Sequence, residues 1–506
     1  MPTKTVIIIG SGFSGLSAAC FMAKAGWKVT VLEKHEIPGG RARKFESDGF
    51  TFDMGPSWYW MPDVFERFFK QFGKSVSEYY TLQRLDPSYR VYWPDGPIDI
   101  PADYAQLKQL FESIEPGSSI KLDLFLEQAE YKYKTGMQNL VLKPGLSLLE
   151  FMDKDVIEGV FKLDIFSSMK KHVAKYFKDS RLRELMEFPV LFLGALPEKT
   201  PALYSLMNYA DIKGGTWFPK GGMYKVVEGM HKLAVELGVE FRFDTDVTSI
   251  EVSNAHAKVV ETKTHSFEAD VVIASADYHH VETKLLAAEN RSYTAKYWDD
   301  RVMAPGCLLY YVGLDKKLKN VQHHSLFFDV PFKQHAEEIY ITKQWPAEPL
   351  FYVSMTTATD ADMAPQGCEN LFFLIPVAPG LENDSEEIRE HYFRKIVSRM
   401  EKQVGESIAD SIIFKRTYAH ADFINDYNSF KGNAYGLANT LSQTAILKPS
   451  LKSRKVKNLF YAGQLTVPGP GVPPALISGE VVATQVIKEY GMGNLKRGAS
   501  EIKHNN

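Results

Sequence analysis

The sequence predicts a mixed α/β fold, and three patterns along the chain carry that prediction. An apolar strand at the N-terminus runs into a glycine-rich turn and a helix, which is typical of a βαβ unit. Strand patterns alternate with turn residues in the middle of the chain, and a strand–loop–helix pattern follows near the C-terminus. The 506 residues are enough for two or more domains.

The first element is an apolar strand, residues 6–9, whose end is a turn with three spaced glycines. Gly10 permits the tight turn, Gly12 lets the backbone approach a pyrophosphate, and Gly15 lets the next helix pack on the strand. The start of that helix offers free N–H groups and the positive end of the helix dipole to an anion. This arrangement predicts a bound dinucleotide.

The helix and second strand complete the unit. Residues 16–24 form an Ala-rich amphipathic helix that Gly26 ends, and the strand at 29–33 finishes on Glu33. A carboxylate here, about 20 residues after the glycines, accepts hydrogen bonds from ribose hydroxyls and repels a 2′-phosphate. The alternative is a glycine-rich turn in an ordinary α/β protein, and the strand, helix and acid together favour the dinucleotide.

A second glycine pair at residues 38–42 indicates which dinucleotide binds. Gly39 and Gly40 expose backbone N–H groups, and Arg41 offers a fork of donors suited to a phosphate or to the edge of a flavin ring. Enzymes that use a nicotinamide cofactor do not need this element. The alternative is a surface turn with a solvated arginine.

The middle of the chain predicts helices first and sheet afterwards. Helical patterns dominate residues 60–210, and a further helix runs from about Gly221 to Gly238. Strand patterns follow at 239–243, 246–250, 257–260 and 267–274, and residues 300–415 mix strands and helices as a second, sheet-based domain would.

Residues 458–479 predict a strand, a loop of glycines and prolines, and a helix that begins near Pro474. Backbone donors around Gly463, Gly471 and Val472 are placed to meet the pyrimidine end and the ribityl chain of a flavin. A stiff turn without a cofactor is the alternative.

Composition excludes several classes of protein. A net charge of −3 gives no sign of a surface for nucleic acid. The spacing of Cys20, Cys307 and Cys368 matches neither a zinc site nor a disulfide framework, so we expect no metal and a reducing compartment. No apolar stretch reaches the roughly 18 residues of a spanning helix, and the N-terminal apolar run is expected to be a strand and not a signal peptide.

Together these motifs resemble those of the bacterial-type phytoene desaturases, which are FAD-dependent carotenoid desaturases, over nearly the whole chain. The motifs are Gly39–Ala42, Phe52–Tyr59, Pro219–Met223, Asn433–Gly436 and Gly463–Pro473. The resemblance implies non-covalent FAD and oxidation of CH2–CH2 to CH=CH in phytoene or a related C40 carotenoid, as a step of carotenoid biosynthesis. Related desaturases of the 3,4-type act on hydroxylated or cyclised carotenoids. Two further candidates share the scaffold: a flavin amine or porphyrinogen oxidase, and a non-catalytic lipid-handling protein such as the Rab GDP-dissociation inhibitors.

The resemblance also implies a division of the chain. A Rossmann-like FAD-binding domain is expected to comprise residues 1–70, 215–300 and 415–495. A substrate domain that faces the membrane, built on a sheet with helices, is expected to comprise residues 71–214 and 301–414. Residues 496–506 are expected to be a disordered tail. The expected cofactor-binding residues are Gly10, Gly12, Gly15, Glu33, Gly40, Arg41, Val247, Gly463, Gly471 and Val472.

Chemistry of this kind needs little acid–base machinery, because the flavin takes a hydride while the protein orients the substrate and excludes water. The sequence shows no nucleophile triad, and no catalytic residue is assigned. Polar candidates near the ring are Arg41, Asp53, His279 and His280, for each of which an ion pair or a loop cap is the commoner role. The aromatic residues Trp58–Trp60, Tyr204, Tyr209, Trp217 and Phe218 either line a polyene channel or pack in the core.

A polyene substrate dissolves in lipid, so we expect a cytoplasmic protein attached peripherally to the inner face of the cell membrane. Residues 165–183 carry six basic residues against one acidic, with apolar residues at helical spacing, which predicts an interfacial helix. A solvated basic face on an ordinary helix is the alternative. Quinone or oxygen is the expected electron acceptor.

Overall fold

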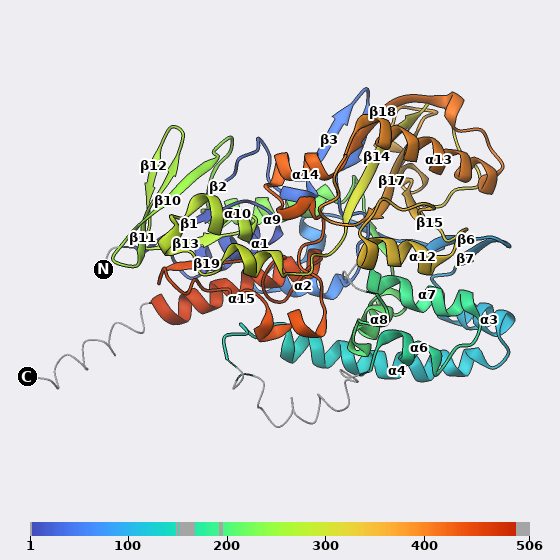
Figure 1. The fold of residues 1–506 in the computed structure, drawn as a ribbon, viewed down its shortest axis with the longest axis horizontal. Coiled ribbons are helices and arrows are strands. Elements are labelled where there is room, and N and C mark those ends of the chain that lie inside the picture. Colours follow the sequence, from blue (N-terminus) through green and yellow to red (C-terminus); the bar gives the residue numbers. More distant parts are fainter. Residues whose placement is uncertain (1–2, 148–149, 151–166, 192–195, 492–506) are drawn as a thin grey trace, which may run out of the picture.

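The computed structural model describes residues 3–147, 150, 167–191 and 196–491. Its elements form a five-stranded parallel sheet, a small three-stranded sheet, a larger seven-stranded sheet and a helical region (Figure 1). The predicted tail at 496–506 lies outside the described residues, and the domain boundaries stay a prediction.

The parallel sheet brings together segments from both ends and the middle of the chain, in the order β19-β13-β1-β2-β9. Its strands are β1 (Thr5–Ile9), β2 (Lys28–Leu32), β9 (Glu240–Arg242), β13 (Val271–Ala274) and β19 (Leu459–Tyr461). The helices packed here are α1 (Phe13–Lys24), α9 (Tyr224–Glu236) and α15 (Val472–Tyr490). The predicted βαβ unit and the C-terminal strand–loop–helix are therefore confirmed.

Small residues allow α1 to lie close to its neighbours. A Cβ added to Gly15 would fall 2.1 Å from the carbonyl oxygen of Gly10, and one added to Gly479 would fall 2.2 Å from that of Ser14. Side chains at these two positions would push α1 away from the glycine turn and from α15. Both contacts fix the direction in which the N-terminus of α1 points.

The predicted strand at 267–274 is in fact two strands that belong to different sheets. β12 (Ser266–Glu268) pairs with β11 (His256–Thr262), which pairs with β10 (Val247–Ser253), whereas β13 joins the parallel sheet. The chain changes sheets at Asp270, whose carboxylate accepts a hydrogen bond from the Thr5 N–H at 2.8 Å. This long-range contact has no local sequence signal.

The seven-stranded sheet has the order β18-β14-β17-β16-β15-β6-β7. Its strands are β6 (Tyr89–Trp93), β7 (Gly96–Ile100), β14 (Gly306–Leu314), β15 (His324–Phe327), β16 (Phe351–Ser354), β17 (Glu369–Val377) and β18 (Ile412–Tyr418), and α13 (Glu386–Val404) packs on it. The prediction that helices dominate residues 60–210 is wrong for β6, β7 and the short β5 (Leu82–Arg84). Tyr89, Val91, Tyr92 and Trp93 of β6 are buried, and β6 pairs in parallel with β15, more than 200 residues away along the chain.

The helical region contains α3 (Tyr104–Ile114), α4 (Ser118–Thr135), α6 (Met169–Ala174), α7 (Ser180–Leu191) and α8 (Leu206–Ile212). Elsewhere lie α2 (Pro62–Lys70), α10 (Tyr278–His280), α11 (Ala295–Asp299), α12 (Phe332–Glu337), α14 (His420–Tyr427), β3 (Lys44–Ser47), β4 (Phe50–Asp53) and β8 (Trp217–Pro219). Among the described residues, no helix combines the length and apolar character needed to cross a bilayer.

The predicted interfacial helix at 165–183 is wrong in its described part, because α6 ends at Ala174 and α7 begins only at Ser180. Residues 165 and 166 lie outside the described residues. The side chains of Met169, Val173 and Phe177 are fully buried. The Phe177 ring contacts Phe111 and Phe125 of the neighbouring helices, so the apolar side of this segment faces the core and not a membrane.

Candidate active site

A single continuous cavity of about 630 Å³ runs from the carboxyl ends of β1 and β2 to one face of the seven-stranded sheet. Nine of the ten expected cofactor-binding residues line it: Gly10, Gly12, Glu33, Gly40, Arg41, Val247, Gly463, Gly471 and Val472. Gly15 does not, because it lies beneath the turn, against Gly10. The cavity has the position expected of a ligand site in a parallel sheet.

Glu33 lies at one end of this cavity, and its carboxylate also binds neighbouring loop residues, which the sequence does not reveal. One carboxylate oxygen, Oε2, accepts hydrogen bonds from the Ser11 N–H at 2.8 Å and from the Ser11 hydroxyl at 2.6 Å. The other oxygen, Oε1, accepts from the His35 N–H at 3.1 Å. A carboxylate has about four acceptor sites, so capacity remains for a ribose hydroxyl while Glu33 holds the glycine turn.

The two glycine pairs lie against each other beside Glu33. Gly10 has φ +96° and Gly40 has φ +54°, both in the left-handed region. A Cβ on Gly40 would lie 3.4 Å from the Gly12 Cα, whereas one on Gly12 would meet nothing within 4 Å and would project into open space. Together with the start of α1, these turns form a concave surface of backbone that a pyrophosphate fits.

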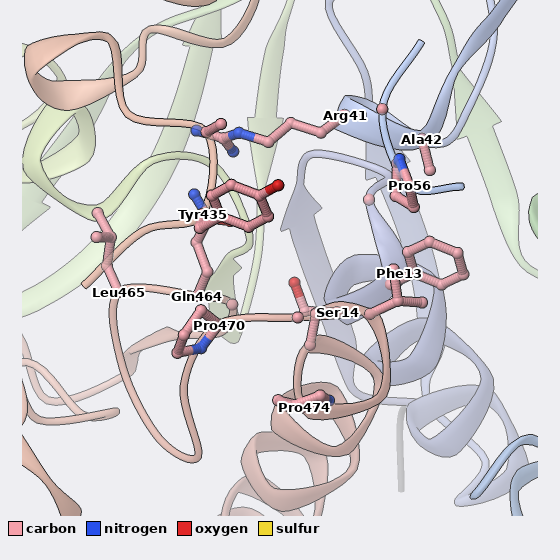
Figure 2. Close-up of a pocket in the computed structure, with 18 of the residues that line it drawn as sticks. Phe13, Ser14, Arg41, Ala42, Pro56, Tyr435, Gln464, Leu465, Pro470 and Pro474 are labelled. Carbon is pink, nitrogen blue, oxygen red and sulfur yellow. The ribbon is translucent and has the colours of Figure 1, made fainter. Parts of the chain in front are cut away.

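Arg41 extends across the middle of the cavity toward Tyr435 and Gln464 (Figure 2). Its Nη2 donates to the Ser429 hydroxyl at 3.1 Å, and its buried Nε has no partner among the described residues. With its amide oxygen facing the guanidinium, Gln464 accepts from Arg41 Nη1 at 3.3 Å and Nη2 at 3.1 Å. Burial lowers the pKa of Arg41, and the nearby Asp277 carboxylate opposes that shift.

Fewer backbone donors are free at the C-terminal loop than the sequence suggests. The Gly463 N–H donates to the Ser478 hydroxyl at 2.9 Å. Pro473 and Pro474 in the first turn of α15 have no N–H. Val472 therefore supplies the donor at this helix terminus, and its N–H has no acceptor among the described residues.

One cavity contains the groups that FAD requires. It is lined by the carboxylate of Glu33, by the backbone of the glycine turns, by Arg41 and the start of α15, and by apolar side chains. The orphaned Nε of Arg41 and the open volume next to Gly12 are compatible with such a ligand. The residues present fit this cofactor.

The four polar candidates from the sequence are not gathered at one place. Asp53 lies outside the main cavity and caps α9, where its carboxylate accepts from the N–H groups of Met223 at 2.7 Å and Tyr224 at 2.8 Å. Burial raises its pKa to about 6. The His279 ring packs on Phe430 outside the cavity, and burial lowers its pKa to about 4. His280 lines the nucleotide end, near Val247, and Arg41 lies in the middle.

The aromatic candidates divide between channel and core. Trp58, Trp60 and Tyr204 line the cavity, whereas Tyr59, Tyr209, Trp217 and Phe218 do not. Leu309, Tyr352 and Leu374 of the seven-stranded sheet also line this apolar end.

Sequence reasoning missed Tyr352, and it missed Asp277, a buried cavity residue that follows β13. Asp277 follows the carboxyl end of a parallel strand, a position that signals a ligand site. Tyr352 has no such signal.

Comparisons with known proteins identify the family of the chain. Residues 13–487 match the family described as flavin containing amine oxidoreductase. A carotenoid 3,4-desaturase of Haloarcula japonica is 40% identical over 96% of this chain and 98% of its own length. A zeta-carotene-forming phytoene desaturase of Myxococcus xanthus is 32% identical over 96% of this chain and 94% of its own length.

Among solved structures, an oxidoreductase from Methanosarcina mazei has a TM-score of 0.60 at 15% identity, over 96% of this chain and 100% of its own. At that identity the likeness shows the fold alone. The chain is thus an FAD-dependent oxidoreductase that belongs to the flavin containing amine oxidoreductase family, among its carotenoid desaturases.

Proposed function

We propose that this chain desaturates phytoene or a related C40 carotenoid, converting CH2–CH2 to CH=CH in a step of carotenoid biosynthesis. The observation that carries the proposal is the single cavity, which joins a nucleotide-binding end to an apolar, aromatic end. FAD bound there supplies a hydride acceptor. The protein supplies the position of the reacting bond and the exclusion of water.

In this proposal the residues of the nucleotide end hold FAD. Glu33 binds the adenosine ribose, the turns with Gly10, Gly12 and Gly40 hold the pyrophosphate, and Val247 meets the adenine. Gly15 acts indirectly, by letting α1 approach the turn. Arg41, Gly463, Gly471 and Val472 contact the flavin end, where Gln464 orients the guanidinium.

At the apolar end, side chains of the seven-stranded sheet hold the hydrocarbon. Leu309 pairs with Leu374 and Leu374 with Tyr352, so these three cavity residues form one row across β14, β17 and β16. Trp58 faces the same space from the loop after β4. Dispersion contacts along such a wall fix the position of a long apolar chain, and positioning is a large part of the rate enhancement for this chemistry.

A second candidate is 3,4-desaturation of a hydroxylated carotenoid. It is favoured by the carotenoid 3,4-desaturase of Haloarcula japonica, which is 40% identical to this chain, whereas the phytoene desaturase of Myxococcus xanthus is 32% identical.

We also propose peripheral attachment to the inner face of the cell membrane and a quinone or oxygen as the electron acceptor. The outer side of α4 supports the attachment, because Ile120, Leu124 and Tyr131 are 66%, 51% and 41% exposed and recur at helical spacing. The exposed lysines of α6 lie on the adjacent helix (Figure 1).

Coexpression with a phytoene-producing pathway tests the proposal directly. Extracted pigment that absorbs at longer wavelength than phytoene supports desaturation of phytoene. New absorption only when a hydroxylated, partly desaturated carotenoid is supplied supports the second candidate. No new absorption with either carotenoid, while yellow FAD-containing protein is present, contradicts both candidate functions.

A further inference from the structure

We infer that Tyr352 accepts the proton that desaturation releases, with His324 behind it as the positioning residue that takes the proton from the phenol. This inference rests on the proposed desaturation. Removing a hydride from carbon leaves a cation, and forming the double bond requires a neighbouring C–H to lose its proton. The acceptor of that proton has to be reachable from the apolar end of the cavity.

Tyr352 has the required location. It lies on β16, is 3% exposed, and lines the cavity in the row with Leu374 and Leu309. Its hydroxyl is 2.6 Å from His324 Nδ1. A phenol that donates to an imidazole can take a proton from carbon on one side while it passes its own proton to nitrogen on the other.

His324 is held in one orientation for this contact. Its ring is fully buried and stacks on Trp58, a cavity residue, with centroids 4.1 Å apart and an interplanar angle of 9°. Its Nε2 is buried and has no partner among the described residues. An unpaired buried nitrogen costs stability, so an orphan at this place calls for a functional explanation.

The electronic state of the pair suits the role. Burial lowers the pKa of His324 well below its usual value, so the imidazole is neutral and able to accept a proton. Burial also raises the pKa of Tyr352, which keeps the phenol protonated before the reaction. A depressed pKa makes the imidazole a weak base, but a carbocation is a strong acid and a weak base suffices.

Atoms and electrons balance in this reaction. The hydride leaves one carbon for FAD, and the adjacent C–H bond then breaks. Its electron pair becomes the π bond, and its proton goes to the Tyr352 oxygen. The phenolic proton moves to His324 Nδ1, so the positive charge passes from the substrate to the imidazole. After product release the imidazolium returns its proton to the Tyr352 oxygen, and the tyrosine gives up a proton to water, which restores the pair.

The neighbouring His323 provides a matched control. It is also buried, directly before β15, and its Nε2 is also without a partner among the described residues. Its Nδ1, however, pairs with the Thr359 hydroxyl at 2.6 Å, and neither residue lines the cavity. Replacing His323 removes a buried imidazole from the same segment, together with its edge contact on the His324 ring at 4.5 Å between centroids, and leaves the hydrogen bond between Tyr352 and His324 in place.

The test uses FAD-loaded Tyr352→Phe, His324→Ala and His323→Ala enzymes with phytoene in liposomes and an acceptor. Phytoene deuterated at the carbon that loses the proton reports on this step separately from hydride transfer. We expect turnover to fall about a hundredfold in the first two variants, the lower end of the range for a general base. Their isotope effect should rise above that of the parent, and added imidazole should restore part of the activity of His324→Ala. His323→Ala should keep the parent isotope effect.

Tyr352→Phe with parent turnover and parent isotope effect overturns the inference, whether or not His324→Ala folds. Equal losses in the His323 and His324 variants, without imidazole rescue, also overturn it by indicating a structural role. If neither phytoene nor a hydroxylated carotenoid bleaches the flavin of the parent enzyme in the absence of oxygen, the proposed desaturation fails, and this inference fails with it.

Discussion

Glu33 illustrates how one side chain serves the fold and also belongs to the proposed cofactor site. Its carboxylate holds Ser11 through two hydrogen bonds and still faces the cavity. Removing it therefore loosens the glycine turn in addition to removing the proposed ribose acceptor. The two effects are separable, because Ser11→Ala loses the hydroxyl contact and keeps both the backbone contact and the carboxylate.

We expect Glu33→Ala to weaken FAD binding by about 1 to 3 kcal/mol, the usual range for a lost hydrogen bond to a charged group. Titration of the apoprotein with FAD, followed by flavin fluorescence, measures this. Ser11→Ala should weaken binding less. Unchanged affinity in Glu33→Ala would exclude the ribose role.

His335 makes stability depend on pH. Its Nε2 pairs with the Pro376 carbonyl oxygen at 2.8 Å, and its Nδ1 accepts from the Leu350 N–H at 3.0 Å, so the folded protein holds a neutral imidazole. Burial lowers its pKa from 6.5 to about 4. The pKa of His335 is lower in the folded than in the unfolded protein. The stabilisation by the neutral imidazole is therefore complete above pH 6.5 and is lost as the pH falls toward 4.

The urea concentration at the unfolding midpoint of the parent should therefore decrease as the pH is lowered from 6.5 to 4. Protonation of this residue changes the free energy of unfolding by up to roughly 1.4 kcal/mol per pH unit in that range. His335→Gln should be less stable at pH 7 and should show a shallower slope in the same window. Parallel slopes for parent and variant would mean that the imidazole titrates normally in the fold.

At the residue scale the sequence predicts those site residues that follow local geometry. Gly10 and Gly12 are recognisable because a turn requires them within a few positions of a strand and a helix. Tyr352 and His324 are not, because their contact arises from the register of β15 against β16, and Trp58, which stacks on His324, lies more than 260 residues earlier. No spacing within the sequence encodes that meeting.

At the element scale the loop from Gly463 to Val472 lines the end of the cavity where we propose that the flavin lies. Gly469 has φ +139° and Gly471 has φ +108°, which side chains rarely adopt. A Cβ on Gly469 would lie 2.9 Å from Asn439 Oδ1 and 3.1 Å from Lys448 Nζ. Lys448 is buried, and burial lowers its pKa to about 7. This loop has little room to adjust.

Gly469→Ala and Gly471→Ala should each lower turnover more than His279→Ala or His280→Ala, because they move the loop against the flavin. Strain at such positions costs on the order of 1–3 kcal/mol. Steady-state desaturation, with flavin content determined for each variant, provides the comparison. A histidine replacement that abolishes turnover while FAD stays bound would reverse the expected order.

Elements with strong local periodicity are predictable, and those that depend on partners far along the chain are less so. Helix α9 and strands β1 and β2 lie where their patterns place them. Strands β6 and β7 were missed, although Pro94 and Asp95 between them form a two-residue turn that signals a hairpin. Residues 165–183 resemble one amphipathic helix because periodicity shows an apolar face without showing what covers it.

At the scale of the whole molecule, loops from both ends of the chain form the nucleotide end of the cavity. The seven-stranded sheet, from the middle of the chain, forms the other end. The strand order β19-β13-β1-β2-β9 brings the C-terminal loop beside the N-terminal turn, as the two motifs imply. The seven-stranded sheet then closes the apolar end. Its composition from β6 and β7 together with β14 to β18 was not predictable, because strands so far apart in sequence meet only in the folded chain.

The proposed membrane contact is a property of this whole surface and not of one helix. Ile120 and Leu124 on α4 supply exposed apolar area, and Lys170, Lys171 and Lys175 supply charge on and directly after the neighbouring α6.

We expect Ile120→Gln with Leu124→Gln to weaken binding to all vesicles, since burying such side chains contributes roughly 1.5–3 kcal/mol each. Replacing the three lysines by Glu should weaken binding to anionic vesicles alone, by about 1 kcal/mol per residue. Cosedimentation with neutral and anionic liposomes distinguishes the two contributions, and Val235→Gln, at an exposed apolar position on α9, is the control. If both sets of variants pellet as the parent does, α4 and α6 do not form the contact.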